Sequence, residues 1–221
     1  MENRKKTMLA GVSGLLFIVL IILVKTVNVD AIGPNGTEIG LSGINEGFHR
    51  LTGEIKILYT ITDVFAVLAI LVAVSFAFLG LYQLIKRKSF KKVDREIYAL
   101  GVLYVVTLGL YVLFEKVVVN YRPVIMSGES EPEASFPSSH TMLICVIMGS
   151  ACMVLDKYIK DEKIRRILDI CCKAVLVATV LGRLFCGVHW FTDILGGVLI
   201  SIFMLSIFSM AKSGKTDLIN P

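Results

Sequence analysis

Charged residues are scarce in this sequence, and their scarcity excludes the commonest class of protein. Asp, Glu, Lys and Arg together make up 19% of the 221 residues, whereas 55% are hydrophobic. The mean hydropathy is +0.75. A chain of this composition is too apolar for an ordinary soluble domain and is typical of an integral membrane protein.

The sequence also lacks the cysteine patterns that hold metal ions or build a disulfide framework. None of its five cysteines has CxxC or Cys/His ligand spacing, and all of them fall in apolar stretches. We interpret them as small buried hydrophobic residues and expect neither a metal nor another cofactor. They are Cys145, Cys152, Cys171, Cys172 and Cys186.

The positive charge is not arranged as nucleic-acid binding requires. The net charge is +5, but the basic residues cluster at the ends of apolar runs and the aromatic residues lie inside those runs. This arrangement favours a role in membrane orientation. We therefore expect the lipid bilayer as a partner and no nucleic acid.

What the sequence does contain is six apolar runs of about the length that a helix needs to cross a hydrocarbon core. A basic segment precedes the first run as in a signal peptide, but no small-residue cleavage site follows it, so we count it as a span. The expected fold is all-α, a single domain over residues 1–221 built as a bundle of six transmembrane helices. The spans are residues 8–24, 59–85, 97–118, 140–155, 167–188 and 192–210.

A shorter helix is expected between the first two spans. Ile44, Phe48 and Leu51 recur at positions i, i+4 and i+7, the pattern of an amphipathic helix that lies on a membrane surface.

The basic residues also predict the orientation of the chain. When the spans alternate in direction, the basic residues of the N-terminus, the 86–95 loop, the 157–166 loop and the C-terminal tail fall on one side. The positive-inside rule makes that side cytoplasmic. We expect a multi-pass protein of the plasma membrane with both termini in the cytoplasm.

Ionisable residues are costly in hydrocarbon, and six of them converge on the outer ends of spans three to six. Residues of this kind often contact only lipid headgroups, but three cations, two imidazoles and a carboxylate at one depth suit a phosphate monoester or diphosphate. The six are Lys116, Arg122, His140, Arg183, His189 and Asp193. Asp63, toward the outer side of the second span, receives no role.

The chemistry follows from the physical properties of these groups. His189 and Asp193 are four residues apart and share one face if the segment is helical. A carboxylate that binds one ring nitrogen leaves the other free to attack phosphorus, and His140 would then protonate the departing oxygen. The cations would bind the equatorial oxygens, assisted by backbone N–H groups around Ser138 and Ser139 at a helix start.

Three segments resemble the signature motifs of the type-2 phosphatidic acid phosphatase family, which is related in site architecture to vanadium haloperoxidases and bacterial acid phosphatases. The segments are Lys116 to Pro123, Pro137 to His140, and Arg183 to Asp193 with His189 between. The order and position of the motifs match over residues 40 to 210.

The resemblance implies a metal-independent phosphatase that works through a phosphohistidine, and the orientation predicted from the basic residues puts its site on the outer membrane face. The resemblance gives His189 as the nucleophile, Asp193 as its orienting partner and His140 as the acid. The phosphate pocket would consist of Lys116, Arg122, Ser138, Ser139 and Arg183.

The first motif departs from the family pattern. In the family, the lysine of this motif usually lies one residue further from the Arg-Pro pair than Lys116 does here. The position where that lysine is expected is therefore occupied by Glu115. One residue on a helix is a rotation of about 100°. Either a local bulge returns Lys116 to the pocket, or Glu115 faces it. In addition, Ser139 replaces a commoner Gly and Gly182 replaces a usual Ser.

The resemblance narrows the substrate only to lipid phosphates. In a bacterial host it points to undecaprenyl diphosphate, which we rank first, or to phosphatidylglycerol phosphate or phosphatidic acid. The alternatives are a non-catalytic transporter or binding protein for a lipid phosphate, and an enzyme that transfers the phosphoryl group to an acceptor other than water. The paired nucleophile and acid favour an enzyme, because binding alone needs only charge.

Overall fold

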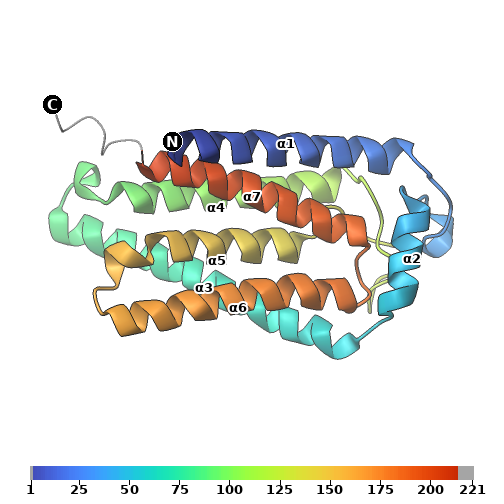
Figure 1. Cartoon of the computed structure of the whole chain (residues 1–221). Coiled ribbons are helices and arrows are strands. Elements are labelled where there is room, and N and C mark those ends of the chain that lie inside the picture. Colours follow the sequence, from blue (N-terminus) through green and yellow to red (C-terminus); the bar gives the residue numbers. More distant parts are fainter. Residues whose placement is uncertain (1, 214–221) are drawn as a thin grey trace.

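The computed structural model describes residues 2–213, and this part of the chain is mostly helical. Within it the only β-type pairings are two isolated bridges, Asp30 with Ile39 and Tyr121 with Ala134. Six long helices lie side by side, and a short one, α2, lies across one end of the bundle (Figure 1). The elements are α1 (Glu2–Thr26), η1 (Pro34–Gly36), α2 (Ser42–Thr52), α3 (Lys56–Arg87), η2 (Phe90–Lys92), α4 (Arg95–Lys116), α5 (Ser139–Tyr158), α6 (Glu162–Phe185) and α7 (Phe191–Ser213).

The all-α prediction is confirmed, and each expected span corresponds to one long helix with shifted ends. Most helices continue into the charged flanks because hydropathy marks the hydrocarbon region and not the helix terminus. Helix α6 stops at Phe185, three residues before the approximate end expected for the fifth span at Val188. Gly187 has a φ of +79°, and a Cβ atom there would lie 2.5 Å from Glu54 Cγ, so the turn after α6 requires glycine.

Five helices of the described chain are long and apolar enough to cross a membrane, namely α1, α3, α4, α5 and α7. The sixth, α6, is of similar length but carries Arg165, Arg166, Asp169 and Lys173. It packs against α5 and α3 and runs alongside the other long helices (Figure 1). The count of six spans therefore remains a prediction.

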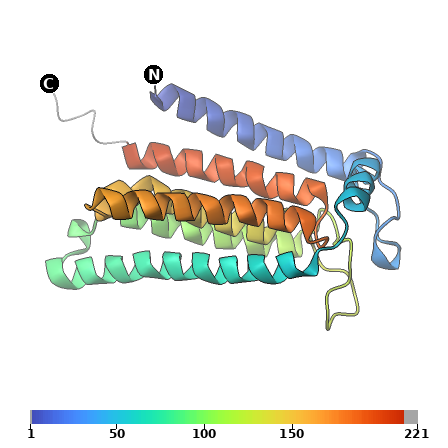
Figure 2. The ribbon, with the colours of Figure 1, turned by 60° about the horizontal axis from the view of Figure 1, so that its bottom comes forward.

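The bundle is organised around α5, which packs against α3, α4, α6 and α7. Its side chains Ile144, Val146, Met148 and Val154 are buried. In Figure 2, α1 lies on the far side of α7 from α3. Most large apolar side chains of the outer helices are exposed, as expected where lipid is the solvent.

The cysteines do not all have the expected surroundings. Cys145 and Cys186 are buried, and the prediction is confirmed for them. It is wrong for Cys171, which is exposed on α6 because the outer surface of this helix has no packing neighbour among the described residues.

The connecting segments gather at the two ends of the bundle. The N-terminus, the α3–α4 turn, the α5–α6 turn and the end of α7 lie at one end, which therefore holds the predicted basic segments (Figure 1). The other end holds α2, the 117–138 loop and the α6–α7 turn. Lys215 of the predicted basic tail lies outside the described residues.

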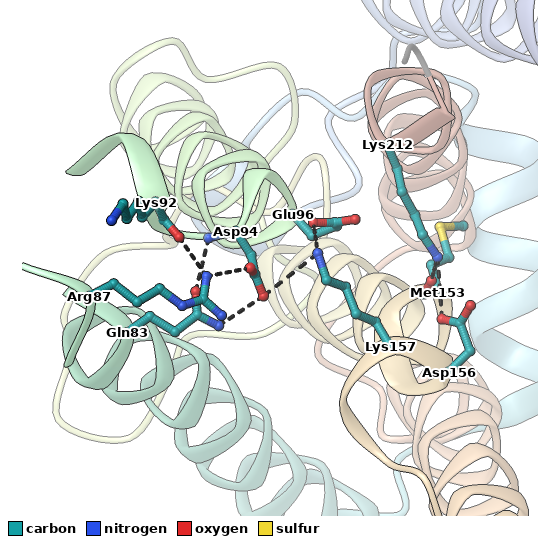
Figure 3. A network of polar contacts seen from close by, with 9 residues as sticks. All are labelled: Gln83, Arg87, Lys92, Asp94, Glu96, Met153, Asp156, Lys157 and Lys212. Atoms are coloured by element: carbon teal, nitrogen blue, oxygen red, sulfur yellow. Dashed lines mark hydrogen bonds and ion pairs between the residues drawn. The ribbon is translucent and has the colours of Figure 1, made fainter. Parts of the chain in front are cut away.

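Polar contacts fasten the basic end (Figure 3). Asp94, which precedes α4, accepts hydrogen bonds from Arg87 Nη1 at 2.7 Å and from Gln83 Nε2 at 2.9 Å. Lys157 of α5 forms an ion pair with Glu96 and lies 3.6 Å from Asp94. These contacts join α3, α4 and α5, and they pair Arg87 and Lys157 with acidic partners at an end that keeps an excess of basic residues.

Gly197 allows α7 to approach the start of α5, and its substitution tests that packing. A Cβ atom at this position would lie 2.9 Å from Thr141 Cβ and 3.0 Å from the Ser138 carbonyl oxygen. We expect Gly197→Ala to lower the free energy of unfolding by about 1–3 kcal/mol, measured by denaturant unfolding in detergent. Gly109→Ala is the matched control, because nothing lies within 4 Å of its Cβ and alanine favours the helix. Equal destabilisation by the two substitutions would contradict the prediction.

Candidate active site

The polar turn that precedes α5 brings the starts of α5 and α7 together. Ser138 caps α5, because its Oγ accepts a hydrogen bond from the Thr141 N–H at 3.5 Å. The Ser138 N–H donates to the backbone carbonyl of Asp193 at 2.9 Å. The Ser138 N–H, which was expected to help bind phosphate, therefore has a partner within the protein, whereas Ser139 borders a cavity beside His189.

His189 and Asp193 meet as the sequence predicts, although only Asp193 lies on a helix. Both side chains are almost completely buried, and His189 Nδ1 lies 3.5 Å from Asp193 Oδ2. The same oxygen accepts a hydrogen bond from the Trp190 N–H at 2.9 Å. The indole Nε1 of Trp190 in turn donates to the Tyr121 carbonyl at 2.7 Å. The turn before α7 thus holds the carboxylate beside the imidazole.

The surroundings of His189 favour its neutral form. Burial, followed by the positive charges of Arg122 and Arg183 and then by His140, lowers the pKa of His189 well below 6.5. A neutral imidazole retains the lone pair that a nucleophile needs. Neither ring nitrogen has a hydrogen-bond partner of ordinary geometry among residues 2–213.

Two arginines lie close to this histidine, and each has a carboxylate partner. The Arg183 side chain on α6 is fully buried, its Nη2 lies 2.5 Å from Asp63 Oδ1, and its guanidinium lies 4.8 Å from the centre of the Tyr59 ring. Its Nε and Nη1 have no hydrogen-bond partner within the described chain. Arg122 Nε lies 3.0 Å from Glu133 Oε2. Donors on a buried guanidinium without partners are suited to an anion.

Asp63 is the residue of this site that sequence reasoning missed. Besides its contact with Arg183, Asp63 Oδ1 lies 3.1 Å from His140 Nε2. One oxygen on α3 therefore links a histidine on α5 to an arginine on α6. The available signal was the ionisable side chain itself within an apolar span, but its partners are distant in sequence.

A small cavity beside His189 shows how Glu115 and Lys116 are placed relative to that histidine. It has a volume of about 10 Å³, enough for about one water molecule, and is bordered by Glu115, Ser135, Ser139 and His189 among others. Glu115 and Lys116 are both exposed, and of the two only Glu115 lines this cavity. The rotation of α4 therefore presents Glu115 to the cavity.

The predicted site residues thus fall into connected groups at the end of the bundle that holds α2. His189 lies beside Asp193, His140 joins Arg183 through Asp63, and Lys116 remains apart. Among the described residues, no three His, Cys, Asp or Glu side chains are placed to hold a metal ion.

Comparison with known proteins gives two matches. The sequence profile of the PAP2 superfamily matches residues 96–216. The fold is similar to a crystal structure described as the first transmembrane PAP2 type phosphatidylglycerolphosphate phosphatase from Bacillus subtilis, with 18% identity and a TM-score of 0.64. That match covers 96% of this chain and 98% of the other. No sequence among curated proteins matches significantly.

The placement of Glu115 and Lys116 predicts how each affects anion binding. We expect Lys116→Gln to leave the Kd for inorganic phosphate within about twofold of the wild type. Glu115→Gln should tighten phosphate binding by up to about fivefold, because it removes a carboxylate from the cavity wall. Calorimetric titration of phosphate measures both. A tenfold loss of affinity in Lys116→Gln would place that lysine in the pocket.

Proposed function

Because the chain belongs to the PAP2 superfamily, we propose that it is a multi-pass membrane phosphatase that hydrolyses a lipid phosphate through a phosphohistidine. Family membership supports a phosphatase that acts on lipid phosphates. The observation that carries the mechanistic proposal is the buried pair of His189 and Asp193, with Arg183 and His140 beside it. We further propose that the whole chain forms one catalytic domain.

In the first step, the neutral imidazole of His189 attacks phosphorus and forms a P–N bond. The bond from phosphorus to the lipid oxygen breaks, and its electron pair stays on that oxygen, which takes a proton from His140. Asp193 stabilises the positive charge that develops on His189. Arg122 and Arg183 bind the equatorial oxygens, with the Ser139 N–H as a further donor.

In the second step, water attacks the phosphohistidine. His140 is now neutral and accepts a proton from this water, which returns the histidine to its acid form as microscopic reversibility requires. The P–N bond breaks with its electron pair returning to His189, and inorganic phosphate leaves. No metal enters either step of the proposal.

We propose that the site opens at the outer face of the plasma membrane. It lies at the end of the bundle opposite the basic segments, and the positive-inside rule places basic segments in the cytoplasm. Helix α2 lies across the site end and exposes Ile44 and Leu51, which suits a helix at the membrane interface. A lipid headgroup would enter the site from this interface while its chain remains in the bilayer.

Undecaprenyl diphosphate is the substrate we propose first, and phosphatidylglycerol phosphate and phosphatidic acid are the alternatives. The phosphatidylglycerol phosphate alternative has support from the similar crystal structure, which is described as a phosphatase for that lipid. A phosphate pocket without a metal suits a phosphate monoester and a diphosphate equally. A direct assay of the three lipids is therefore needed to identify the substrate.

Phosphate release from a panel of these three lipids by purified protein tests the proposal. We expect the wild type to release phosphate in EDTA. His140→Ala should lower kcat by about 10²–10⁴-fold because it removes the acid, and His189→Ala should lower it at least as far because it removes the nucleophile. His49→Ala is the matched control and should stay within about threefold of the wild type.

Each outcome of this assay has a distinct meaning. Equal release by the wild type and His189→Ala would show that the nucleophile is wrong. Loss of turnover in EDTA would show that the reaction needs a metal. Tight binding of all three lipids without release would indicate the transporter or binding protein.

A further inference from the structure

Asp63 is the only acidic residue of α3, a helix otherwise suited to span the membrane. An unpaired carboxylate at such a position is costly, so ionisable residues there are usually paired and functional. Asp63 has two partners from two other helices: its Oδ1 lies 2.5 Å from Arg183 Nη2 and 3.1 Å from His140 Nε2. It therefore joins the proposed acid to a proposed phosphate-binding cation.

The contact with Arg183 determines which guanidinium donors are available. Asp63 takes Nη2, and Tyr59, one turn earlier on α3, packs its ring against the guanidinium. Nε and Nη1 have no hydrogen-bond partner in the described structure. The start of α3 thus holds the guanidinium from one side and leaves two donors for an anion on the other.

The contact between Asp63 and His140 determines which ring nitrogen of His140 carries the proton. A carboxylate accepts hydrogen bonds, so Nε2 of His140 carries the proton that faces Asp63. The neutral ring then has its free lone pair on Nδ1. Protonation places a second hydrogen on Nδ1, where a leaving oxygen can take it.

Two arginines and a second histidine also lie near His140. Arg183 faces it from α6, Arg122 from the 117–138 loop, and His189 from the α6–α7 turn. Asp193 on α7 is occupied by His189 and the Trp190 N–H, and Glu115 on α4 borders the cavity that Ser139 lines. Asp63 is the carboxylate that contacts His140 directly, so it is the group that stabilises the imidazolium between two arginines.

We propose that Asp63 is a positioning residue of the reaction, which orients His140 and Arg183 and stabilises the imidazolium form of His140 when it carries the proton. This inference rests on the proposed function. When the bond from phosphorus to the lipid oxygen breaks, the proton moves from His140 Nδ1 to that oxygen. Asp63 remains ionised throughout and exchanges no proton.

The test compares two phosphate monoesters with Asp63→Asn. A lipid alkyl phosphate needs a proton on its departing oxygen, whereas p-nitrophenyl phosphate has a leaving group that departs without one. We expect kcat for the alkyl phosphate to fall by about 10²-fold or more, and kcat for the aryl phosphate to fall much less. The alkaline limb of the pH–rate profile should also move to lower pH, because the imidazolium loses its carboxylate.

Asp63→Glu and Asp169→Asn complete the design. Asp63→Glu keeps the carboxylate and should restore most of the wild-type ratio of alkyl to aryl turnover. Asp169→Asn removes a carboxylate that pairs with Lys173 on α6 and should leave both rates unchanged. The alkyl-to-aryl ratio does not depend on the folded fraction, so it remains informative where Asp63→Asn reduces the yield of folded protein.

The outcomes separate this inference from the function on which it rests. A wild type that hydrolyses neither ester overturns the proposed function. The role of Asp63 alone is overturned under a different set of results. In that case the wild type hydrolyses both esters, and Asp63→Asn lowers both rates equally and leaves the alkaline limb of the pH–rate profile in place. The role of Asp63 is also overturned if the ratio of alkyl to aryl turnover is as low in Asp63→Glu as in Asp63→Asn. The negative charge of the carboxylate would then make no difference to the reaction.

Discussion

The site depends on the junction between the start of α5 and the start of α7, and Asp193 is the residue that makes it. Its backbone carbonyl accepts the hydrogen bond from the Ser138 N–H. Its carboxylate accepts the bond from the Trp190 N–H and lies beside His189. Gly197, one turn further along α7, has no side chain to keep the two helices apart. Asp193 therefore links the starts of the two helices and places its carboxylate beside the imidazole.

Around this junction, two guanidinium groups are buried, and each is paired with a partly exposed carboxylate. A guanidinium or carboxylate removed from water costs several kcal/mol unless a partner of opposite charge is held against it. Arg183 and Asp63 form such a pair, and Arg122 and Glu133 form another. Because the helices hold these groups in place before any ligand arrives, an incoming phosphate meets donors that need little rearrangement. The polar contacts at the opposite end join α3, α4 and α5.

Much of this arrangement follows from the sequence alone. Apolar runs of sufficient length predict the long helices, and the four-residue spacing of His189 and Asp193 predicts their contact. The charged flanks, in contrast, conceal the true helix ends, and α6 has too many charges for hydropathy to establish it as a span. The stop of α6 before Gly187 depends on a backbone angle that composition does not encode.

Contacts between helices that are far apart in the sequence could not be predicted, for a physical reason. Asp63 meets its partners only after α3 packs against α5 and α6, so nothing near it in the sequence indicates them. The choice between Glu115 and Lys116 likewise depends on the rotation of α4 about its own axis, and one residue changes that by about 100°. Ser138 was expected to offer its N–H to phosphate, but that donor is taken by a carbonyl on another helix.

The most direct test of the account is detection of the phosphoryl group on His189 during a single turnover. Enzyme mixed with a lipid phosphate is quenched in base, where phosphohistidine is stable, digested, and analysed by mass spectrometry. The account predicts a phosphorylated peptide whose modified residue is His189, and no such peptide from His189→Ala. A phosphoryl group on a different residue, or a completed turnover that never labels the enzyme, would contradict it.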